Sequence, residues 1–300
     1  MNRLIRLFLT GTLLFTLPVT AFAAAETPAA GETTTEEEQG TIHPPASQQG
    51  SGDSSENTDT SDSTSDESSS AGVSWSDANT ASSPAAGDGD YTVCIDPGHQ
   101  GSWVDMSEKE PSAPGSSEMK AKATTGTQGS YSGKAEYELN LEISLLLRDE
   151  LEKRGYRVVL TREDNDTAIS NAERALLAYE EGGDIYVRIH ANGSEDPSVS
   201  GALAMVPSPA NPYVGDLAED SYLLGESILN AYCEKASFSS LGVQYYDNMT
   251  GINWSKLPVM ILEMGFMTNQ SDDLRMADAS VQKLMAEGIA DGIDAYFECR

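Results

Sequence analysis

The chain has 300 residues, and its 48 acidic and 18 basic side chains give a formal net charge of −30 at pH 7. This charge argues against nucleic acid as a partner, because phosphates attract surfaces that are rich in Lys and Arg. Three Cys and three His are too few for a disulfide-rich scaffold, and they leave few candidates for a histidine-based metal site.

Residues 1–23 have the pattern of a secretory signal peptide. Two Arg precede a mostly apolar run at 7–17, and Ala21-Phe22-Ala23 matches a small-x-small cleavage site. The apolar run is short for a membrane span, although an uncleaved anchor is the alternative reading. We therefore expect export to the extracellular space, cell wall or periplasm, with no stable membrane insertion after cleavage.

Residues 24–90 have the composition of a disordered linker. They contain 14 acids and no Lys or Arg, and almost no large apolar side chains. Such a segment buries too little surface to offset the roughly 1–2 kcal/mol of backbone entropy that each ordered residue loses. We interpret it as an acidic spacer, and a solubilising tail without a specific role is the alternative.

Residues 91–300 alternate between strand and helix patterns. This alternation predicts a single α/β domain with a largely parallel, twisted sheet flanked by helices. Ser170 and Glu173 have the spacing of a capping box, which marks the start of one helix. The expected strands are 91–96, 156–161, 184–190, 202–206 and 258–263, and the expected helices are 138–154, 170–181, 217–235 and 281–298.

Three reactive side chains follow expected strands. His99 comes after the first strand through the turn Pro97-Gly98, His190 ends the strand DIYVRIH, and Glu263 ends the strand PVMILE. In open α/β sheets, functional groups gather at the carboxyl ends of the strands, so these three could converge. Taken singly, His190 could be a satisfied core histidine and His99 an ordinary turn residue.

Two imidazoles and a carboxylate make a common catalytic zinc site with one position left for water. A second carboxylate is then needed to accept the proton of that water. Glu263 is one of the two acids. The other must come from another element, and Glu136 and Glu138 at the start of the first expected helix are both candidates.

Five motifs in this order resemble the zinc-dependent N-acetylmuramoyl-L-alanine amidases, in particular the amidase type 3 catalytic domain. The resemblance spans about 91–297 and rests on VCIDPGHQG, EYELNL, LTRED, RIHAN and LPVMILEMGFMTN. It implies Zn²⁺ as the cofactor and peptidoglycan as the substrate. The reaction it implies is hydrolysis of the amide between N-acetylmuramic acid and L-alanine of the stem peptide by zinc-activated water.

The resemblance also implies roles for individual residues. His99, Glu136 and His190 match the zinc ligands, and Glu263 matches the catalytic glutamate. Glu136 is favoured over Glu138 because the family's glutamate stands four residues before the Asn of an Asn-Leu pair, here Asn140-Leu141. Positions that recur in the family and are read mainly as structural supports are Arg162, Arg174, Asn192 and Asn269.

Some features are particular to this chain. An insertion at 100–135 separates the first two matched ligands, and it could be a lid, part of a glycan groove or a tolerated surface loop. Arg188 stands two residues before His190 on the same strand face, so it could contact a substrate carboxylate or orient an active-site Glu, with a remote salt bridge as the alternative. Trp254 could stack on a sugar or pack against the sheet, and Asn192 is a further candidate for substrate contact.

Two other functions remain open at this stage. One is a zinc peptidase that cuts within the stem peptide, and the other is a catalytically inactive cell-wall-binding module. The presence of all four matched residues argues against the inactive module, since binding alone needs no base. Whether a protein activator is required is also left open.

Overall fold

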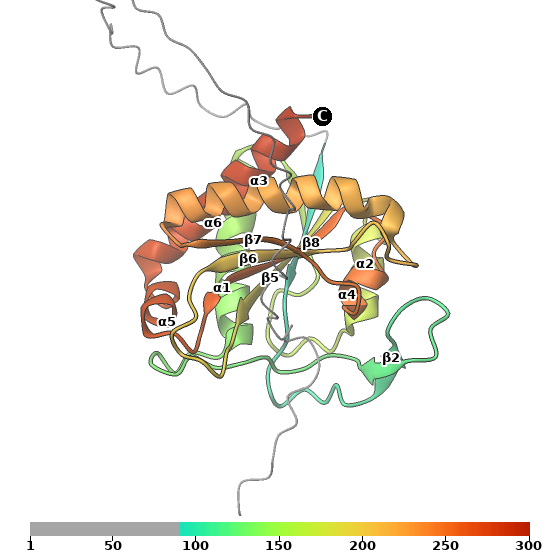
Figure 1. The fold of residues 1–300 in the computed structure, drawn as a ribbon, viewed down its shortest axis with the longest axis horizontal. Coiled ribbons are helices and arrows are strands. Elements are labelled where there is room, and N and C mark those ends of the chain that lie inside the picture. The colour runs from blue at the N-terminus through green and yellow to red at the C-terminus, as the bar shows by residue number, and fades with distance from the viewer. Residues whose placement is uncertain (1–90) are drawn as a thin grey trace, which may run out of the picture. The chain divides into compact units, whose positions relative to one another are not determined.

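The computed structural model describes residues 91–300, which form a mixed α/β domain around a six-stranded sheet (Figure 1). The predicted signal peptide at 1–23 and linker at 24–90 lie outside the described residues. The strands of the sheet are β1 (Thr92–Pro97), β4 (Arg157–Leu160), β5 (Ile185–Asn192), β6 (Ala202–Val206), β7 (Ser240–Tyr245) and β8 (Val259–Phe266).

The strand order is β4-β1-β5-β8-β6-β7. The first four strands run parallel to one another, β6 runs antiparallel to β8, and β7 is parallel to β6. The prediction of a single α/β domain with a largely parallel sheet is confirmed. The strand β7 was not expected, and its interior contains Gly242 in a left-handed conformation, which weakens the strand pattern of the sequence.

Helices cover both faces of the sheet. They are α1 (Glu136–Lys153), α2 (Asn171–Glu180), α3 (Ala218–Ala236), α4 (Thr250–Asn253), α5 (Gln270–Met276) and α6 (Ala279–Glu298), with a 3₁₀ turn η1 (Gly215–Leu217). One face of the sheet packs against α1, α3 and α6 through side chains such as Leu139, Leu224 and Ile289. The other packs against α2 and α4 through Ala175 and Ile252. Within 91–300, no helix combines the length and apolar character that a membrane span requires.

Two strands are longer than expected. Pairing between β5 and β8 continues past His190 and Glu263 to Asn192 and Phe266, with a register shift between His190 and Asn192. The prediction that His190 and Glu263 end their strands is therefore wrong, although both lie within three residues of the carboxyl end. In β8 the extension includes the buried apolar side chains of Met264 and Phe266, so the apolar pattern of the strand continues past the acid.

The helices α1 and α2 each begin where side chains accept hydrogen bonds from backbone N–H groups. Ser170 accepts a hydrogen bond from the backbone N–H of Glu173, and the Glu173 carboxylate accepts from Ser170, so the predicted capping box is confirmed. The first helix begins at Glu136, two residues before the predicted start, and the side chain of Glu138 accepts from the backbone N–H of Ala135. Glu138 thus occupies the third helical position, where an acid caps the first turn.

The insertion at 100–135 contains a short hairpin of β2 (Lys109–Pro111) and β3 (Met119–Ala121), which is separate from the main sheet (Figure 1). The hairpin is fixed to two helices on the α2–α4 face of the sheet. The indole N–H of Trp254 donates to the carbonyl oxygen of Pro111 at 2.9 Å, and a carboxylate oxygen of Glu110 accepts from the backbone N–H of Ala172 at 3.1 Å. The insertion is therefore packed onto the domain.

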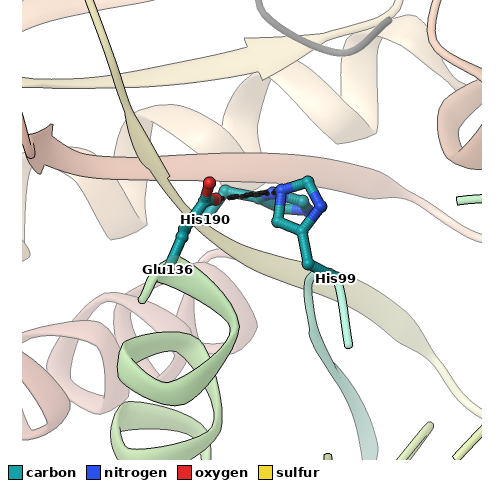
Figure 2. Close-up of side chains that lie close together, drawn as sticks. All are labelled: His99, Glu136 and His190. Atoms are coloured by element: carbon teal, nitrogen blue, oxygen red, sulfur yellow. Dashed lines mark hydrogen bonds and ion pairs between the residues drawn. The ribbon is translucent and has the colours of Figure 1, made fainter. Parts of the chain in front are cut away.

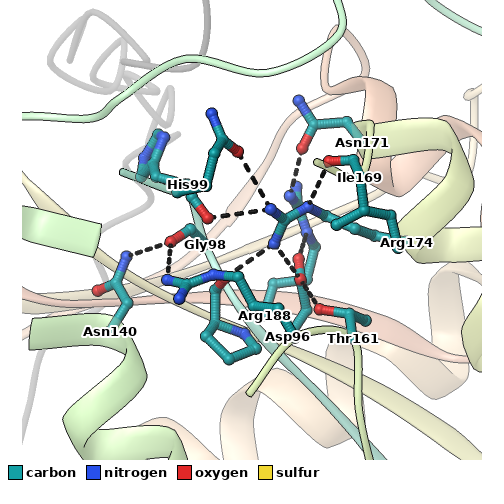
Figure 3. Close-up of polar contacts among 12 residues, drawn as sticks. Asp96, Gly98, His99, Asn140, Thr161, Ile169, Asn171, Arg174 and Arg188 are labelled. Atoms are coloured by element: carbon teal, nitrogen blue, oxygen red, sulfur yellow. Dashed lines mark hydrogen bonds and ion pairs between the residues drawn. The ribbon is translucent and has the colours of Figure 1, made fainter. Parts of the chain in front are cut away.

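A buried carboxylate lies beneath the turn that follows β1 (Figure 3). Asp96 is completely buried and accepts from Arg174 Nη1 and Arg188 Nε, each at 2.8 Å. The hydroxyl groups of Tyr186 and Thr161 also donate to it. Burial alone would raise the pKa of Asp96, but the two guanidinium groups and these hydrogen bonds hold that pKa far below its ordinary value.

Replacing this carboxylate should destabilise the domain strongly. We expect Asp96→Asn to lower the free energy of unfolding by about 3–5 kcal/mol at pH 7, because it leaves two buried guanidinium groups without their counter-charge. A depressed pKa stabilises the fold fully above the unfolded-state value, roughly 3.9, and this contribution decreases progressively as the pH falls from there toward the much lower folded-state pKa. Urea unfolding at pH 7 and pH 3 should therefore show a smaller difference from wild type at pH 3.

The matched control is Glu163→Gln, which removes an exposed partner of Arg148. Exposed pairs contribute at most about 1 kcal/mol. An effect of Asp96→Asn no larger than that of Glu163→Gln would contradict a structural role for the buried cluster.

Candidate functional site

Two arginines hold the turn that carries His99. Arg174 donates to the carbonyl oxygen of His99 at 2.9 Å (Figure 3). Arg174 also donates to the carbonyl oxygen of Pro97, and Arg162 donates to those of Pro97 and Gly98, at distances of 2.8–3.0 Å. These contacts fix His99 in a left-handed conformation with φ of 63°, which is uncommon for a residue other than Gly. The expectation that Arg162 and Arg174 act as structural supports agrees with these bonds.

Three side chains meet beside this turn (Figure 2). His99 comes from the turn after β1, His190 from β5 and Glu136 from the first turn of α1. Oε1 of Glu136 lies 3.1 Å from Nε2 of His99 and 3.3 Å from Nδ1 of His190, and the two nitrogens are 3.2 Å apart. Among residues 91–300, these three side chains form the one His/Cys/Asp/Glu group with metal-binding geometry.

The donor set fits a tetrahedral zinc ion. Ligands about 2.0–2.1 Å from zinc are about 3.3 Å apart at the corners of a tetrahedron, which is close to the three separations observed here. Nδ1 of His99 faces the carbonyl oxygen of Thr124 at 2.9 Å, so this nitrogen carries the proton. In the neutral imidazole, Nε2 of His99 then directs a lone pair at the carboxylate of Glu136, an arrangement that a cation stabilises.

The site is shielded from water. The exposed fractions of His99, Glu136 and His190 are 7, 2 and 4%. Burial lowers the pKa of His190 despite the nearby carboxylate, which favours the neutral imidazole that binds metals. Burial alone would raise the pKa of Glu136, but when His99 is protonated its charge and hydrogen bonds from both imidazoles hold that pKa well below its ordinary value. The neutral imidazole is the other protonation state of His99, the one that binds a metal.

The structure distinguishes between Glu136 and Glu138, the two candidates for the second acid of the site. Glu136 lies in the cluster, and its Oε1 also accepts from the backbone N–H of Ala191 at 3.1 Å. The side chain of Asn140, one helical turn later, lies 3.3 Å from the same oxygen. Glu138 is exposed and caps α1 instead.

Glu263 lies next to the cluster on the neighbouring strand. It pairs in register with His190, so the two side chains project from the same face of the sheet. The two strands that carry them are neighbours, with the usual spacing of about 4.8 Å. Glu263 is 4% exposed. Burial and the nearby charge of Glu263 raise the pKa of Tyr246, so the phenol of Tyr246 lies close enough to interact with this carboxylate. No pattern in the sequence indicated this residue.

The three candidates for substrate contact are buried or partly buried. Arg188 is completely buried, and besides its ion pair with Asp96 it donates to Oδ1 of Asn171 at 2.7 Å. Its burial favours the salt-bridge alternative over contact with substrate. Asn192 is 3% exposed at the end of β5, and Trp254 is partly buried and bonded to the insertion.

Asn269 caps α5, because its side chain accepts from the backbone N–H groups of Ser271 and Asp272. Its own amide donates to the carbonyl oxygen of Pro197 at 2.9 Å. These contacts agree with a supporting role. The thiols of Cys94, Cys233 and Cys299 form no disulfide in this structure.

Sequence reasoning missed the residues of the insertion that contact the cluster. Thr124 contacts His99 through its carbonyl oxygen, and the backbone N–H of Thr127 donates to Oε2 of Glu136 at 2.8 Å. These are backbone groups, for which side-chain identity gives no signal. The one available signal was Gly126 between them, in a glycine-rich loop that precedes a candidate ligand.

Comparison with known proteins gives a consistent picture. The uncharacterized protein YqiI of Bacillus subtilis (strain 168) is 31% identical over 166 residues, which cover 55% of this chain and 76% of YqiI. The N-acetylmuramoyl-L-alanine amidase LytC of the same strain is 28% identical over 225 residues, 75% of this chain but 38% of LytC. This chain therefore spans well under half the length of that named relative.

Among solved structures, the N-acetylmuramoyl-L-alanine amidase from Clostridium difficile 630 is 26% identical with a TM-score of 0.58, and the match covers 71% of this chain and 100% of that one. The Amidase_3 family, described as N-acetylmuramoyl-L-alanine amidase, matches residues 93–295, which include the three side chains of the cluster and the neighbouring Glu263. The chain belongs to the Amidase_3 family of N-acetylmuramoyl-L-alanine amidases.

Proposed function

We propose that this protein is an exported peptidoglycan hydrolase that cleaves the amide between the lactyl group of N-acetylmuramic acid and L-alanine of the stem peptide. The observation that carries the proposal is the triangle of His99 Nε2, His190 Nδ1 and Glu136 Oε1, with Glu263 on the adjacent strand. Membership of the amidase family supplies the substrate class. The signal-peptide pattern supports action outside the cytoplasm.

We propose His99, Glu136 and His190 as ligands of a zinc ion and Glu263 as the catalytic acid and base. A bound zinc ion supplies Lewis acidity, which acidifies water and polarises the scissile carbonyl group. Glu263 accepts the proton of the attacking water on a carboxylate oxygen and delivers it to the leaving amine of L-alanine. The surrounding protein keeps bulk water away from the ligands, which strengthens the electrostatic stabilisation of the developing oxyanion.

The products of peptidoglycan digestion test the reaction. Incubation of purified peptidoglycan with the zinc-loaded protein should release stem peptides with a new L-alanine amine and leave muramic acid intact, as measured by mass spectrometry. New ends within the stem peptide would indicate the peptidase instead. Zinc binding without any release would indicate a wall-binding module.

The role of Glu263 predicts a loss of turnover without a loss of metal. We expect Glu263→Gln to reduce kcat by about 10²–10⁴-fold, since the amide cannot accept the proton, while its zinc content stays at the wild-type value. Glu195→Gln, at an exposed carboxylate in the loop after β5, is the matched control and should retain full activity. Wild-type turnover in Glu263→Gln would exclude this residue as the base.

Zinc content distinguishes the two acids at the start of α1. Wild type and Glu138→Ala should each bind about one zinc ion per chain, whereas Glu136→Ala should lose most of it, because a three-ligand site then keeps only two ligands. Metal analysis after dialysis against buffered zinc measures this directly. Equal zinc in Glu136→Ala and wild type would remove Glu136 from the ligand set.

A further inference from the structure

The insertion at 100–135 contacts two of the three proposed ligands through residues 124–127, which we call the ligand brace. The carbonyl oxygen of Thr124 lies 2.9 Å from Nδ1 of His99, and the hydroxyl of the same residue lies 3.1 Å from that nitrogen. The backbone N–H of Thr127 donates to Oε2 of Glu136, and its carbonyl oxygen accepts from the backbone N–H of Glu136 at 3.0 Å. The brace therefore bridges β1 and α1.

These bonds determine which ligand atoms face the centre of the cluster. A carbonyl oxygen only accepts, so the contact with Thr124 keeps the proton of neutral His99 on Nδ1 and leaves Nε2 to coordinate. The bond from Thr127 occupies Oε2 of Glu136 and leaves Oε1 facing the two imidazoles. Outer contacts of this kind orient metal ligands, and their loss typically weakens metal binding about 10–100-fold.

The brace requires glycine at its centre. Gly126 has φ of 75°, and an added Cβ would lie 2.5 Å from Oε2 of Glu136 and 2.6 Å from Cδ2 of His99. Both are closer than real Cβ contacts allow. The backbone of the brace thus lies directly against both ligands, with no space for a side chain between them.

The rest of the insertion anchors the brace on both sides. Before it, the carbonyl oxygen of Lys122 accepts from the backbone N–H of Asn171 at 2.8 Å, at the start of α2. After it, the buried carboxylate of Asp273 in α5 accepts from the backbone N–H groups of Tyr131 and Ser132 at 2.7 and 2.8 Å. The brace is held between two helices that do not themselves supply ligands.

We infer that the ligand brace is a positioning element that sets the zinc affinity of this protein. It does so by fixing the tautomer of His99 and the rotamer of Glu136. The inference rests on the zinc site of the proposed function, but it concerns the metal affinity and not the reaction catalysed. It assigns the insertion a role in the metal centre in addition to any contact with substrate.

The test compares two substitutions with the same backbone strain. Gly126 and Gly133 both lie in the insertion with φ of 75° and 72°, but a Cβ on Gly133 would meet no atom within 4 Å. Zinc dissociation constants of metal-stripped wild type, Gly126→Ala and Gly133→Ala are measured by competition with a chromophoric chelator. We expect zinc binding to weaken about 10–100-fold in Gly126→Ala and less than about 2-fold in Gly133→Ala.

Equal affinities of folded Gly126→Ala and Gly133→Ala would overturn the inference. A second measurement applies if Gly126→Ala does not fold, as judged by circular dichroism. In ¹⁵N NMR of metal-stripped wild type at a pH where His99 is neutral, the proton should reside on Nδ1, and a proton on Nε2 would overturn the inference. Tight zinc binding without peptidoglycan cleavage would refute the proposed function and leave the inference standing.

Discussion

The site depends on a completely buried carboxylate. Asp96 is buried between Arg174 and Arg188, and the same Arg174 also holds the carbonyl oxygens of Pro97 and His99. The charge of Asp96 keeps Arg174 in place, and Arg174 in turn fixes the backbone that presents His99. Removal of the Asp96 charge leaves both guanidinium groups uncompensated in a low-dielectric interior, so this carboxylate is a structural requirement of the turn.

The sheet topology explains why His99, His190 and Glu263, which lie far apart in the sequence, come together. β1, β5 and β8 are adjacent and parallel, so the side chains near their carboxyl ends gather at one edge of the sheet. The start of α1 approaches this edge and adds Glu136. The antiparallel β6 covers the far side of β8 and pairs with Glu263 through Leu203, which fixes the position of the acid from a second side.

The sequence was sufficient to predict those parts of the molecule that depend on the periodicity of apolar residues or on the chemistry of side chains. The alternation of strand and helix patterns predicted the largely parallel sheet, and the DPGH and HAN motifs identified His99 and His190, whose Nε2 and Nδ1 atoms are 3.2 Å apart. It was insufficient where backbone groups decide the outcome. The extension of β5 to Asn192, the strand β7 and the contacts of Thr124 and Thr127 depend on tertiary pairing that no local pattern encodes.

The left-handed backbone of His99 lowers the stability of the fold at a position where the site requires an imidazole. A residue with a Cβ bears about 1–2 kcal/mol in this conformation, which glycine adopts without cost. The most favourable residue for the turn is therefore one that cannot coordinate an ion. In a descendant released from selection for catalysis, we would expect this position to drift toward glycine early, so that the remnant gains stability as it loses its chemistry.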